Sequence, residues 1–411
     1  MRCWPCTGTD VAPATDVLII GGGPVGLYLA ALLLQDGVSV KVLEQRQARN
    51  LHSRAIGIHP PALEALQQVQ IASSAVRDGI KIREGMAVSG GKTVGIMPFA
   101  PVSDAYPFVL ALPQFRTEQL LEERVRQLDS GALSRGVRVR EITDDGGSVT
   151  AVADTAGEGN SGGTAFSASL VVAADGARSP MRDLLGIGVC RKDYPDHYLM
   201  GDFQDSGLHG DRAVLFLEPG GIVESFPLPG GVRRWVVRLG GPAGSAGPVE
   251  LAGLVRRRTG ILPDAGTNTM LSAFSVRSTL ARRMVAGRVF LLGDAAHEIS
   301  PIGGQGMNLG WLDAQALAPL IHAALADGMS DHRVNLQLQE FQASRQRAAA
   351  AAKRQSEINM MLGRPMPRPL LNLRNLGMGA AAATPAVNTW VARRFTMQQL
   401  DGKQVGSRPP T

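Results

Sequence analysis

The chain has 411 residues, of which 44% are hydrophobic and 19% are charged, as in an ordinary globular protein with room for two or three lobes. The formal net charge of +6 comes from scattered Arg and Lys, so solvated surface charge is favoured over nucleic-acid binding. No apolar run is long enough to span a membrane, and no signal-peptide core precedes the first expected strand. We therefore expect a cytoplasmic protein without nucleic-acid or membrane partners.

Cysteine is sparse, with three residues in the chain. Cys3 and Cys6 form a C-x-x-C pair, which can indicate a redox or metal site. The pair lies ahead of the first expected strand, and neither a second C-x-x-C nor a His pair completes it. We interpret residues 1–14 as a flexible tail and Cys190 as a packing residue, and we predict no bound metal.

The stretch from Val17 to Glu44 has the pattern of a βαβ unit. Val17–Ile20 is a short apolar strand, Pro24–Gln35 has a helical apolar pattern, and Val38–Leu43 alternates into a second strand. The turn after the first strand has the G-x-G-x-x-G spacing, set by Gly21, Gly23 and Gly26. Gly21 permits a tight turn, Gly23 lets backbone approach a pyrophosphate, and Gly26 lets the helix pack closely. The unit therefore predicts a dinucleotide site.

The residues around this turn supply the expected contacts to the nucleotide. Pro24 and Val25 begin the helix, whose N-terminus attracts phosphate. Glu44 ends the second strand and can accept hydrogen bonds from ribose hydroxyls, with Gln45 beside it. An acidic residue in this position favours FAD or NAD over NADP.

The chain then leaves the first lobe and returns to it. Arg54 lies in a loop, where its planar guanidinium could bind phosphate oxygens or be exposed. Residues 80–112 become strand-like and glycine-rich, which suggests a second lobe. Gln114–Leu128 has a helical pattern, and Gln114 and Arg116 at its start can reach a ligand on the first lobe.

The remainder of the chain alternates between the two lobes. Short strands are expected up to Ala174, followed by Asp175 and Gly176. Residues 190–280 alternate like an antiparallel sheet that contains one helix, Pro248–Arg258. Arg288–Leu292 is a buried strand that precedes Gly293 and Asp294, and helical patterns cover residues 307–326 and 333–362. From residue 363 onward the pattern predicts short helices at most.

Three motifs stand in order: GGGPVG with Glu44, AADGARSPMRDLLG at 173–186, and GRVFLLGDAAHEISPIGGQGMNLGWLDA at 287–314. Together they resemble the FAD-dependent aromatic hydroxylases, the group typified by para-hydroxybenzoate hydroxylase. The resemblance covers about residues 15–330 and implies an α/β fold with a discontinuous Rossmann-like FAD lobe. That lobe is expected from residues 15–79, 113–189 and 281–327. An inserted, mainly antiparallel β-sheet substrate lobe is expected from 80–112 and 190–280, and a helical region from 328–411.

The resemblance also implies roles for individual residues. Asp175 and Gly176 look like the family's DG motif, tied to FAD and pyridine nucleotide. Gly293 and Asp294 look like its GD motif, whose aspartate accepts from the ribitol. Arg54 matches an arginine beside the FAD phosphates, and either Gln114 or Arg116 matches a residue that touches the ribitol. The expected flavin-ring contacts come from the loop and helix start at Pro301, Gly304, Gly306, Met307 and Asn308.

The implied reaction is hydroxylation of a phenolic, quinolone or polyketide-like aromatic by O₂, through a flavin C4a-hydroperoxide. Tightly bound FAD is reduced by NAD(P)H, which binds transiently because the sequence has one G-x-G-x-x-G within a βαβ pattern. No catalytic side chain is assigned. Candidates for the base that ionises the substrate are chosen by lobe position alone: His59, Asp104, Tyr106, Asp202 and Arg212.

Other functions remain open at this stage. A related flavoprotein could act as an isoprenoid reductase or halogenase, although the halogenase signature of closely spaced tryptophans is absent. A redox-inactive FAD-binding module is a further alternative. We expect no thioredoxin-like C-terminal domain, and a monomer or homodimer. The proline-rich tail could line a substrate entrance, dock a subunit or touch a membrane, but simple surface packing is favoured.

Overall fold

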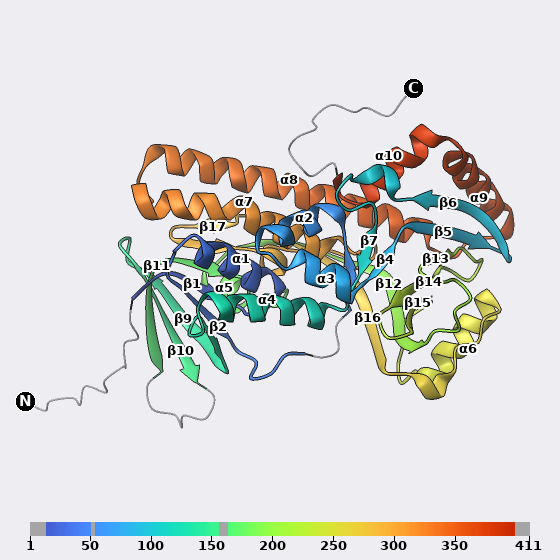
Figure 1. Cartoon of the computed structure of the whole chain (residues 1–411), viewed down its shortest axis with the longest axis horizontal. Helices are drawn as coiled ribbons and strands as arrows, with labels where there is room; N and C mark the ends of the chain where they lie inside the picture. The colour runs from blue at the N-terminus through green and yellow to red at the C-terminus, as the bar shows by residue number, and fades with distance from the viewer. Residues whose placement is uncertain (1–13, 51–53, 156–162, 399–411) are drawn as a thin grey trace, which may run out of the picture.

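The computed structural model describes residues 14–50, 54–155 and 163–398. Two eight-stranded sheets lie at opposite ends of the molecule, and long helices run along the first of them (Figure 1). This arrangement confirms the expected α/β fold with a second, mainly antiparallel sheet. The C-x-x-C pair at Cys3 and Cys6 lies outside the described residues.

The first sheet aligns the strands that precede the three sequence motifs. β1 (Thr15–Ile20) pairs in parallel with β11 (Thr164–Ala173), which pairs in parallel with β18 (Val289–Leu291). Ile20 is opposite Ala173, and Ala173 is opposite Leu291. The turns that follow therefore emerge together at one edge of the sheet, where open α/β sheets bind ligands. The other strands are β17 (Val285–Ala286), β2 (Val40–Glu44), β8 (Leu133–Arg135), β9 (Val137–Asp144) and β10 (Val149–Thr155).

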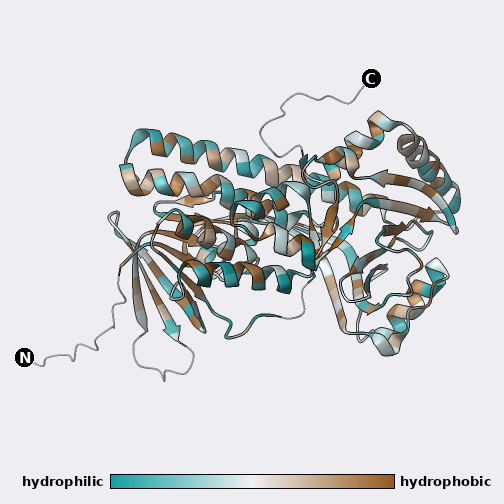
Figure 2. Ribbon diagram, in the orientation of Figure 1, coloured by the Kyte–Doolittle hydropathy of each residue, from teal (hydrophilic) through white to brown (hydrophobic). Residues whose placement is uncertain are grey.

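Helix α1 (Pro24–Gln35) is buried along most of its length, as its nearly continuous apolar sequence requires. It contacts both α4 (Gln114–Leu128) and α7 (Gln305–Asp327). Figure 2 shows hydrophobic residues concentrated in this interior and hydrophilic ones on the outer side of α8 (His332–Leu362). The remaining helices of this region are α2 (Pro60–Gln68), α3 (Ala72–Asp78), α5 (Pro180–Leu184) and the short η3 (Gly293–Ala295).

The second sheet brings together distant parts of the chain. Its order is β19 (His297–Glu298), β16 (Met270–Ala281), β12 (Val189–Gln204), β15 (Val232–Leu239), β14 (Val223–Leu228), β13 (Ala213–Phe216), β5 (Glu84–Ser89) and β6 (Lys92–Pro98). Helix α6 (Pro248–Thr259) covers one face, where Trp235 and Val237 pack with Leu251 and Val255. Because side chains alternate along a strand, the neighbouring residues face the opposite side.

A small three-stranded sheet, which the sequence did not indicate, connects the two larger ones. It consists of β3 (Gly57–Ile58), β7 (Val109–Ala111) and β4 (Ile80–Ile82). Two short 3₁₀ turns, η1 (Ala100–Val102) and η2 (Ala265–Thr267), lie in the connections. The two-residue strand β3 is too short to produce a recognisable alternation.

The C-terminal segment differs from the expectation of short helices at most. Helix α9 (Arg368–Ala383) has 16 residues and α10 (Pro385–Phe395) has 11. Both contact β6, and a Cβ added at Gly95 would lie 2.7 Å from the Cβ of Ala382. Asn388 donates to the carbonyl oxygen of Ile96 at 2.9 Å. Leu and Ala favour helix between the prolines, and packing on β6 holds it in place. Among the described residues, no helix is long and apolar enough to cross a membrane.

We predict that Gly26→Ala lowers the free energy of unfolding by about 1–3 kcal/mol, because the added methyl group overpacks the core. A Cβ at Gly26 would lie 2.1 Å from the carbonyl oxygen of Gly21. Denaturant titration of the purified protein measures the change. Gly377→Ala is the matched control, because a Cβ there meets nothing within 4 Å. It should be neutral or stabilising, and equal stability of both variants would contradict the prediction.

Candidate functional site

A cavity of about 970 Å³ begins at the edge of the first sheet and continues along the free face of the second. Its walls come from the turn after β1, the segments after β11 and β18, the start of α7, and strands β5, β6, β13, β14 and β15. Residues of α8, α9 and α10 close it on another side. The C-terminal segment therefore contributes to the wall of the cavity as well as packing on β6.

Most of the residues singled out from the sequence line this one cavity. They are Gly21, Gly23, Pro24, Val25, Glu44, Gln45, Arg54, Gln114, Asp175, Gly176, Gly293, Asp294, Pro301, Gly304, Gly306 and Met307. They come from segments almost 300 residues apart in the chain, so the parallel register of the first sheet is what unites them.

Three of the candidate residues lie outside the cavity lining. Gly26 packs beneath the turn at Gly21. Arg116 points to Asp78, with its Nε 2.8 Å from a carboxylate oxygen. Asn308 is buried, and its amide binds backbone atoms of Gly57, His59 and Gly304. The side chains of Arg116 and Asn308 therefore contact protein atoms, and their role as cofactor ligands stays a prediction.

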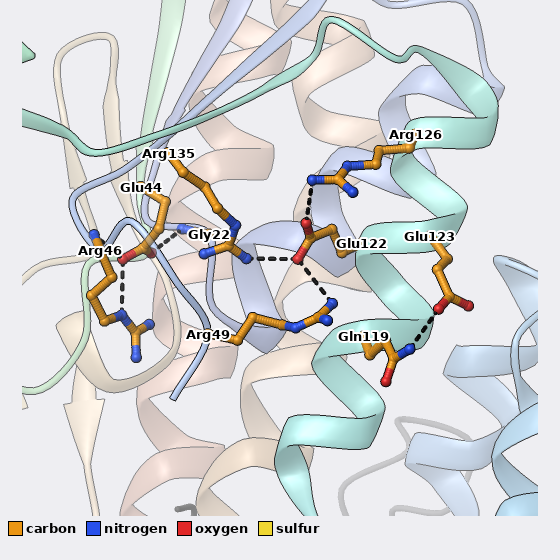
Figure 3. Close-up of polar contacts among 9 residues, drawn as sticks. All are labelled: Gly22, Glu44, Arg46, Arg49, Gln119, Glu122, Glu123, Arg126 and Arg135. Carbon is orange, nitrogen blue, oxygen red and sulfur yellow. Dashed lines mark hydrogen bonds and ion pairs between the residues drawn. The ribbon is translucent and has the colours of Figure 1, made fainter. Parts of the chain in front are cut away.

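At one end of the cavity, Glu44 is held in place by short-range contacts (Figure 3). Its carboxylate accepts from the backbone of Gly22 at 2.8 Å and from both the backbone and the side chain of Arg46 at 2.9 Å. Burial alone would raise the pKa of Glu44, but the hydrogen bonds from Arg46 and Gly22 outweigh it and lower the pKa. Glu44 is thus ionised and fixed beside the G-x-G-x-x-G turn.

A second carboxylate near this end anchors the surrounding arginines. Glu122 on α4 accepts from Arg135 and Arg126, each at 2.7 Å, and from Arg49 at 3.3 Å (Figure 3). Because Glu122 is buried and its partners approach from several segments, the cluster joins α4 to β8 and to the chain after β2. It supports the position of the loop that follows Glu44.

The middle of the cavity holds two aspartates with unused hydrogen-bonding capacity. Asp175 accepts from the backbone of Met181 at 3.0 Å through one oxygen, while the other is buried without a partner among the described residues. Asp294 lines the cavity, and burial is the main cause that raises its pKa to about 6. Asp294 is an exposed residue only in the sense that it borders the cavity, and protein atoms surround it on its other sides. Both side chains can accept hydrogen bonds from a polyhydroxyl chain.

The start of α7 is shaped by glycine and by His59. Gly303 and Gly304 have φ angles of +97° and +66°, which only glycine adopts easily. The Nε2 atom of His59 donates to the carbonyl oxygen of Gly303 at 3.2 Å. Asn308 bonds the same loop through Gly304 at 2.7 Å. The loop therefore presents the N-terminus of α7 to the cavity, where its unpaired amides attract negative charge.

The far end of the cavity is mainly apolar. Alternate residues of the second sheet face it: Ala213 and Leu215 on β13, Ile222 just before β14, Phe226 on β14, and Val236 on β15. Met378 and Ala382 of α9, with Val391 and Phe395 of α10, line another part. Such a surface accepts an aromatic or polycyclic ligand through burial of apolar area.

The structure also locates the five residues considered as a substrate base. Asp104, Tyr106, Asp202 and Arg212 do not line the cavity. Asp202 is paired with Arg234 at 2.7 Å, and Arg212 is paired with Glu84. His59 lines the cavity, and its Nδ1 atom is buried without a hydrogen-bond partner among the described residues. Burial also lowers the pKa of His59 to about 4, so lobe position alone did not identify a suitable base.

One acidic residue of the apolar end escaped the sequence analysis. Glu224 lines the cavity from β14 with only 8% of its surface exposed. Burial raises the pKa of Glu224 to about 7. The signal in the sequence is an acid two residues before Phe226 on an alternating strand. Sequence alone could not tell which face of that strand is buried.

The family to which the chain belongs follows from comparison with known proteins. A family profile described as an FAD binding domain matches residues 14–356. A 6-methylpretetramide 4-monooxygenase from Streptomyces rimosus is 34% identical over 322 residues, which cover 75% of this chain and 55% of that protein. A rifampicin monooxygenase from Streptomyces venezuelae is 32% identical over 393 residues, covering 93% of this chain and 78% of that protein.

Solved structures agree with this relationship. A p-nitrophenol 4-monooxygenase from Pseudomonas putida superposes with a TM-score of 0.84 at 25% identity, covering 97% of this chain and all of that one. An aromatic hydroxylase from angucycline biosynthesis has a TM-score of 0.76 at 26% identity, covering 94% of this chain and 76% of that one. The chain belongs to the FAD-dependent aromatic hydroxylases, a class of flavoprotein monooxygenases.

The cavity fits the cofactor that this family implies. A Cβ at Gly21 would lie 2.3 Å from the carbonyl oxygen of Ala174, whereas one at Gly23 would meet nothing within 4 Å. Gly21 is thus required by the turn, and Gly23 leaves open space beside the start of α1. The unpaired oxygen of Asp175 and the carboxylate of Asp294 provide acceptors further along. A chain of phosphates and hydroxyls matches this order of donors and acceptors.

We predict that Glu224→Gln stabilises the protein at pH 8 but not at pH 4.5. The pKa of Glu224 is about 7 when folded, against an ordinary glutamate value of 4.5. The folded state therefore binds more protons in this range, and stability falls as pH rises through it. The penalty is complete above the folded pKa and is on the order of 3 kcal/mol. Denaturant unfolding of both proteins at the two pH values measures it, and a pH-independent difference would contradict the assignment.

Proposed function

We propose that this protein is an NAD(P)H-consuming hydroxylase of an aromatic small molecule, most simply a phenol or a polycyclic polyketide. The observation that carries the proposal is the single cavity that joins the G-x-G-x-x-G turn to an apolar end. One part can hold a dinucleotide and the other an aromatic ring, so cofactor and substrate would share one enclosed space. Relatives named for pretetramide, rifampicin and nitrophenol substrates support this substrate class.

In this proposal the cavity residues hold FAD in an extended arrangement. Gly23 and the start of α1 would bind the pyrophosphate, and Glu44 would accept from the adenosine ribose. Asp175 and Asp294 would accept from the ribitol hydroxyls. The amides at the start of α7, after Gly304, would face the flavin ring. These assignments use the residues that line the cavity.

Arg54 lines the cavity and also contacts the second sheet. Its guanidinium carbon lies 5.3 Å from the ring centroid of Phe274, and its Nε donates to Ser272 at 3.2 Å. The backbone oxygen of Arg54 accepts from Arg234 at 2.6 Å. We propose that Arg54 connects the two lobes at the cavity wall, with its unfilled donor positions available to FAD.

The chemistry supplied by bound FAD is acceptance of a hydride from NAD(P)H and activation of O₂. The protein contributes orientation, exclusion of water and stabilisation of charge. Amides at the start of α7 stabilise negative charge on the cofactor. The apolar surface formed by Leu215, Phe226 and Val236 keeps water from the reacting ring. One oxygen atom enters the product and the other leaves as water, with the two electrons supplied by NAD(P)H.

Further partners follow from this reaction. We propose that NAD(P)H binds transiently to the FAD lobe, since the sequence has one G-x-G-x-x-G within a βαβ unit. A cytoplasmic location is proposed because that compartment supplies the reductant. We propose a monomer or a homodimer. We propose no nucleic-acid or membrane partner.

We predict that Gly23→Ala lowers FAD affinity at least about tenfold without changing the stability of the apoprotein. The added methyl group would meet no protein atom, but it would occupy space beside the helix N-terminus where phosphate must approach. Quenching of FAD fluorescence on binding measures the affinity, and thermal melting checks the fold. Gly377→Ala should bind FAD normally, so unchanged affinity in Gly23→Ala would contradict this placement.

The proposed activity is tested with the FAD-loaded protein and a panel of phenols, quinolones and polycyclic polyketides. A true substrate should accelerate flavin reduction by NADH or NADPH well above the rate without ligand. With ¹⁸O₂, one labelled oxygen should appear in the product, as mass spectrometry can measure. Reduction that no aromatic ligand accelerates, together with no label in any product, would refute the hydroxylase function.

A further inference from the structure

We propose that Glu224 receives the hydroxyl proton of a phenolic substrate and so prepares the ring for oxygen transfer. This inference rests on the proposed function and assigns to its active site a base that the sequence did not reveal. The group that Glu224 would recognise is a phenolic hydroxyl.

The register of the second sheet fixes the direction of Glu224. Leu215 on β13 and Val236 on β15 are its direct cross-strand partners. Ile222 and Phe226 lie two residues before and after it along the chain, and all four line the cavity. Since side chains alternate along a strand, these residues share the cavity face. Arg234, opposite Phe226, is a further charged residue of this face, and it is paired with Asp202. Glu224 is therefore an unpaired carboxyl among mainly apolar side chains.

The residues on the opposite face confirm this orientation. Val223 packs in the cluster with Trp235 and Leu251 beneath α6. Ser225 accepts a hydrogen bond from Arg233 at 3.0 Å on that same side. Glu224, between them, must point the other way. The strand thus turns one acid toward the cavity.

Glu224 has no hydrogen-bond or ion-pair partner in the described ranges 14–50, 54–155 and 163–398, and it is 92% removed from solvent, with 8% exposed. An unpaired carboxyl in apolar surroundings costs several kcal/mol unless it binds something or is neutral. A glutamate in this position therefore lowers the free energy of unfolding and forms no contact that would offset this loss. Such a group in a cavity is a candidate for function.

The charged groups on the neighbouring strands are paired elsewhere. Arg234 on β15 forms a two-pronged pair with Asp202 at 2.7 and 2.8 Å. Asp196 on β12 binds Arg238 at 2.9 Å and Arg364 at 2.7 Å. These pairs leave no cation beside Glu224 among the described residues, and burial is the cause that raises its pKa to about 7.

One uncharged titratable group also lies near. Tyr198 on β12 is buried, and its hydroxyl has no partner among the described residues. Burial, with the charges of Glu224 and Asp196, raises the pKa of Tyr198. Tyr198 therefore stays protonated at neutral pH. It does not line the cavity, so Glu224 is the group that a ligand can reach.

A proton acceptor of this kind suits a phenol. Near neutral pH the carboxyl is poised between its two forms, as a general base should be. The phenol O–H bond breaks, a new O–H bond forms on a carboxylate oxygen of Glu224, and the electron pair stays on the phenolate oxygen. The combined charge of the pair is unchanged, so no further counter-ion is needed. A phenolate ring is more electron-rich than a phenol and accepts an oxygen atom more readily.

The test measures ionisation of a bound phenol on the oxidised, FAD-loaded protein. The probes are 4-hydroxyacetophenone and 2-naphthol, whose phenolate forms absorb at longer wavelength than the neutral phenols. Titration from about pH 6 to about pH 9 covers the range around the raised pKa of Glu224. At about pH 8, where most Glu224 is a carboxylate, the wild-type protein should hold more of the bound probe as phenolate than water does at the same pH. Because Glu224 keeps the transferred proton, binding of the neutral phenol there should release no proton to solvent.

Three variants separate a direct role from a structural one. Glu224→Gln should keep the fold and FAD but leave the bound probe neutral, with at least about tenfold weaker binding at pH 8. Glu224→Asp should recover part of the ionisation, because it restores a carboxylate at shorter reach. Glu141→Gln is the matched control, since Glu141 is an exposed strand residue outside the cavity. It should behave as the wild type.

The outcomes distinguish this inference from the proposed function. If Glu224→Gln binds and ionises both probes as the wild type does, or if neither probe binds the wild type, the role of Glu224 is refuted. Stronger binding of benzylamine than of either phenol, lost in Glu224→Gln, would show that Glu224 recognises a cation and would also refute it. Glu224-dependent ionisation without ¹⁸O in any product would support this inference and refute the hydroxylase. If Glu224→Gln forms labelled product as fast as the wild type, the hydroxylase function is supported and the role of Glu224 is refuted.

Discussion

The parallel register of β1, β11 and β18 is the constraint on which the rest of the structure depends. It places Ile20, Ala173 and Leu291 side by side, so the three turns that follow reach one sheet edge. Each turn then needs glycine or a short side chain, because backbone approaches backbone closely, as at Gly21 and Gly26. A shift of one strand would separate the residues that meet in the cavity. The cofactor site is thus a property of the sheet as much as of its motifs.

The two faces of the second sheet have different roles: one packs against α6 and stabilises the fold, and the other lines the cavity. The face beneath α6 is filled by residues such as Trp235 and Val237, which bury apolar area. The other face borders the cavity, and α9 and α10 line the same cavity. An unpaired carboxyl at Glu224 can persist there because the packed face supplies stability elsewhere. The chain therefore separates its stable core from its binding surface within single strands.

Much of the fold was predictable because its strongest patterns are local. Pro24–Gln35 and Gln114–Leu128 form helices with the expected bounds, since apolar spacing and prolines define them. The helices α9 and α10 were underestimated because their sequence mixes proline, glycine and alanine, and packing on β6 decides their length. The side-chain contacts of Arg116 and Asn308 were not predictable for another reason. Their partners, Asp78 and the backbone around His59, come from separate segments of the chain.

The sequence by itself determined the class of protein. The glycine spacing before Glu44, with Asp175 and Asp294 after later strands, requires a particular backbone geometry and is therefore readable in the chain. Only the tertiary structure decided what faces the substrate end of the cavity. The direction of Glu224 depends on which side of β14 is covered by α6, and the closing wall depends on how α9 and α10 pack. Both are set by contacts between distant segments, for which a single sequence carries no local signal.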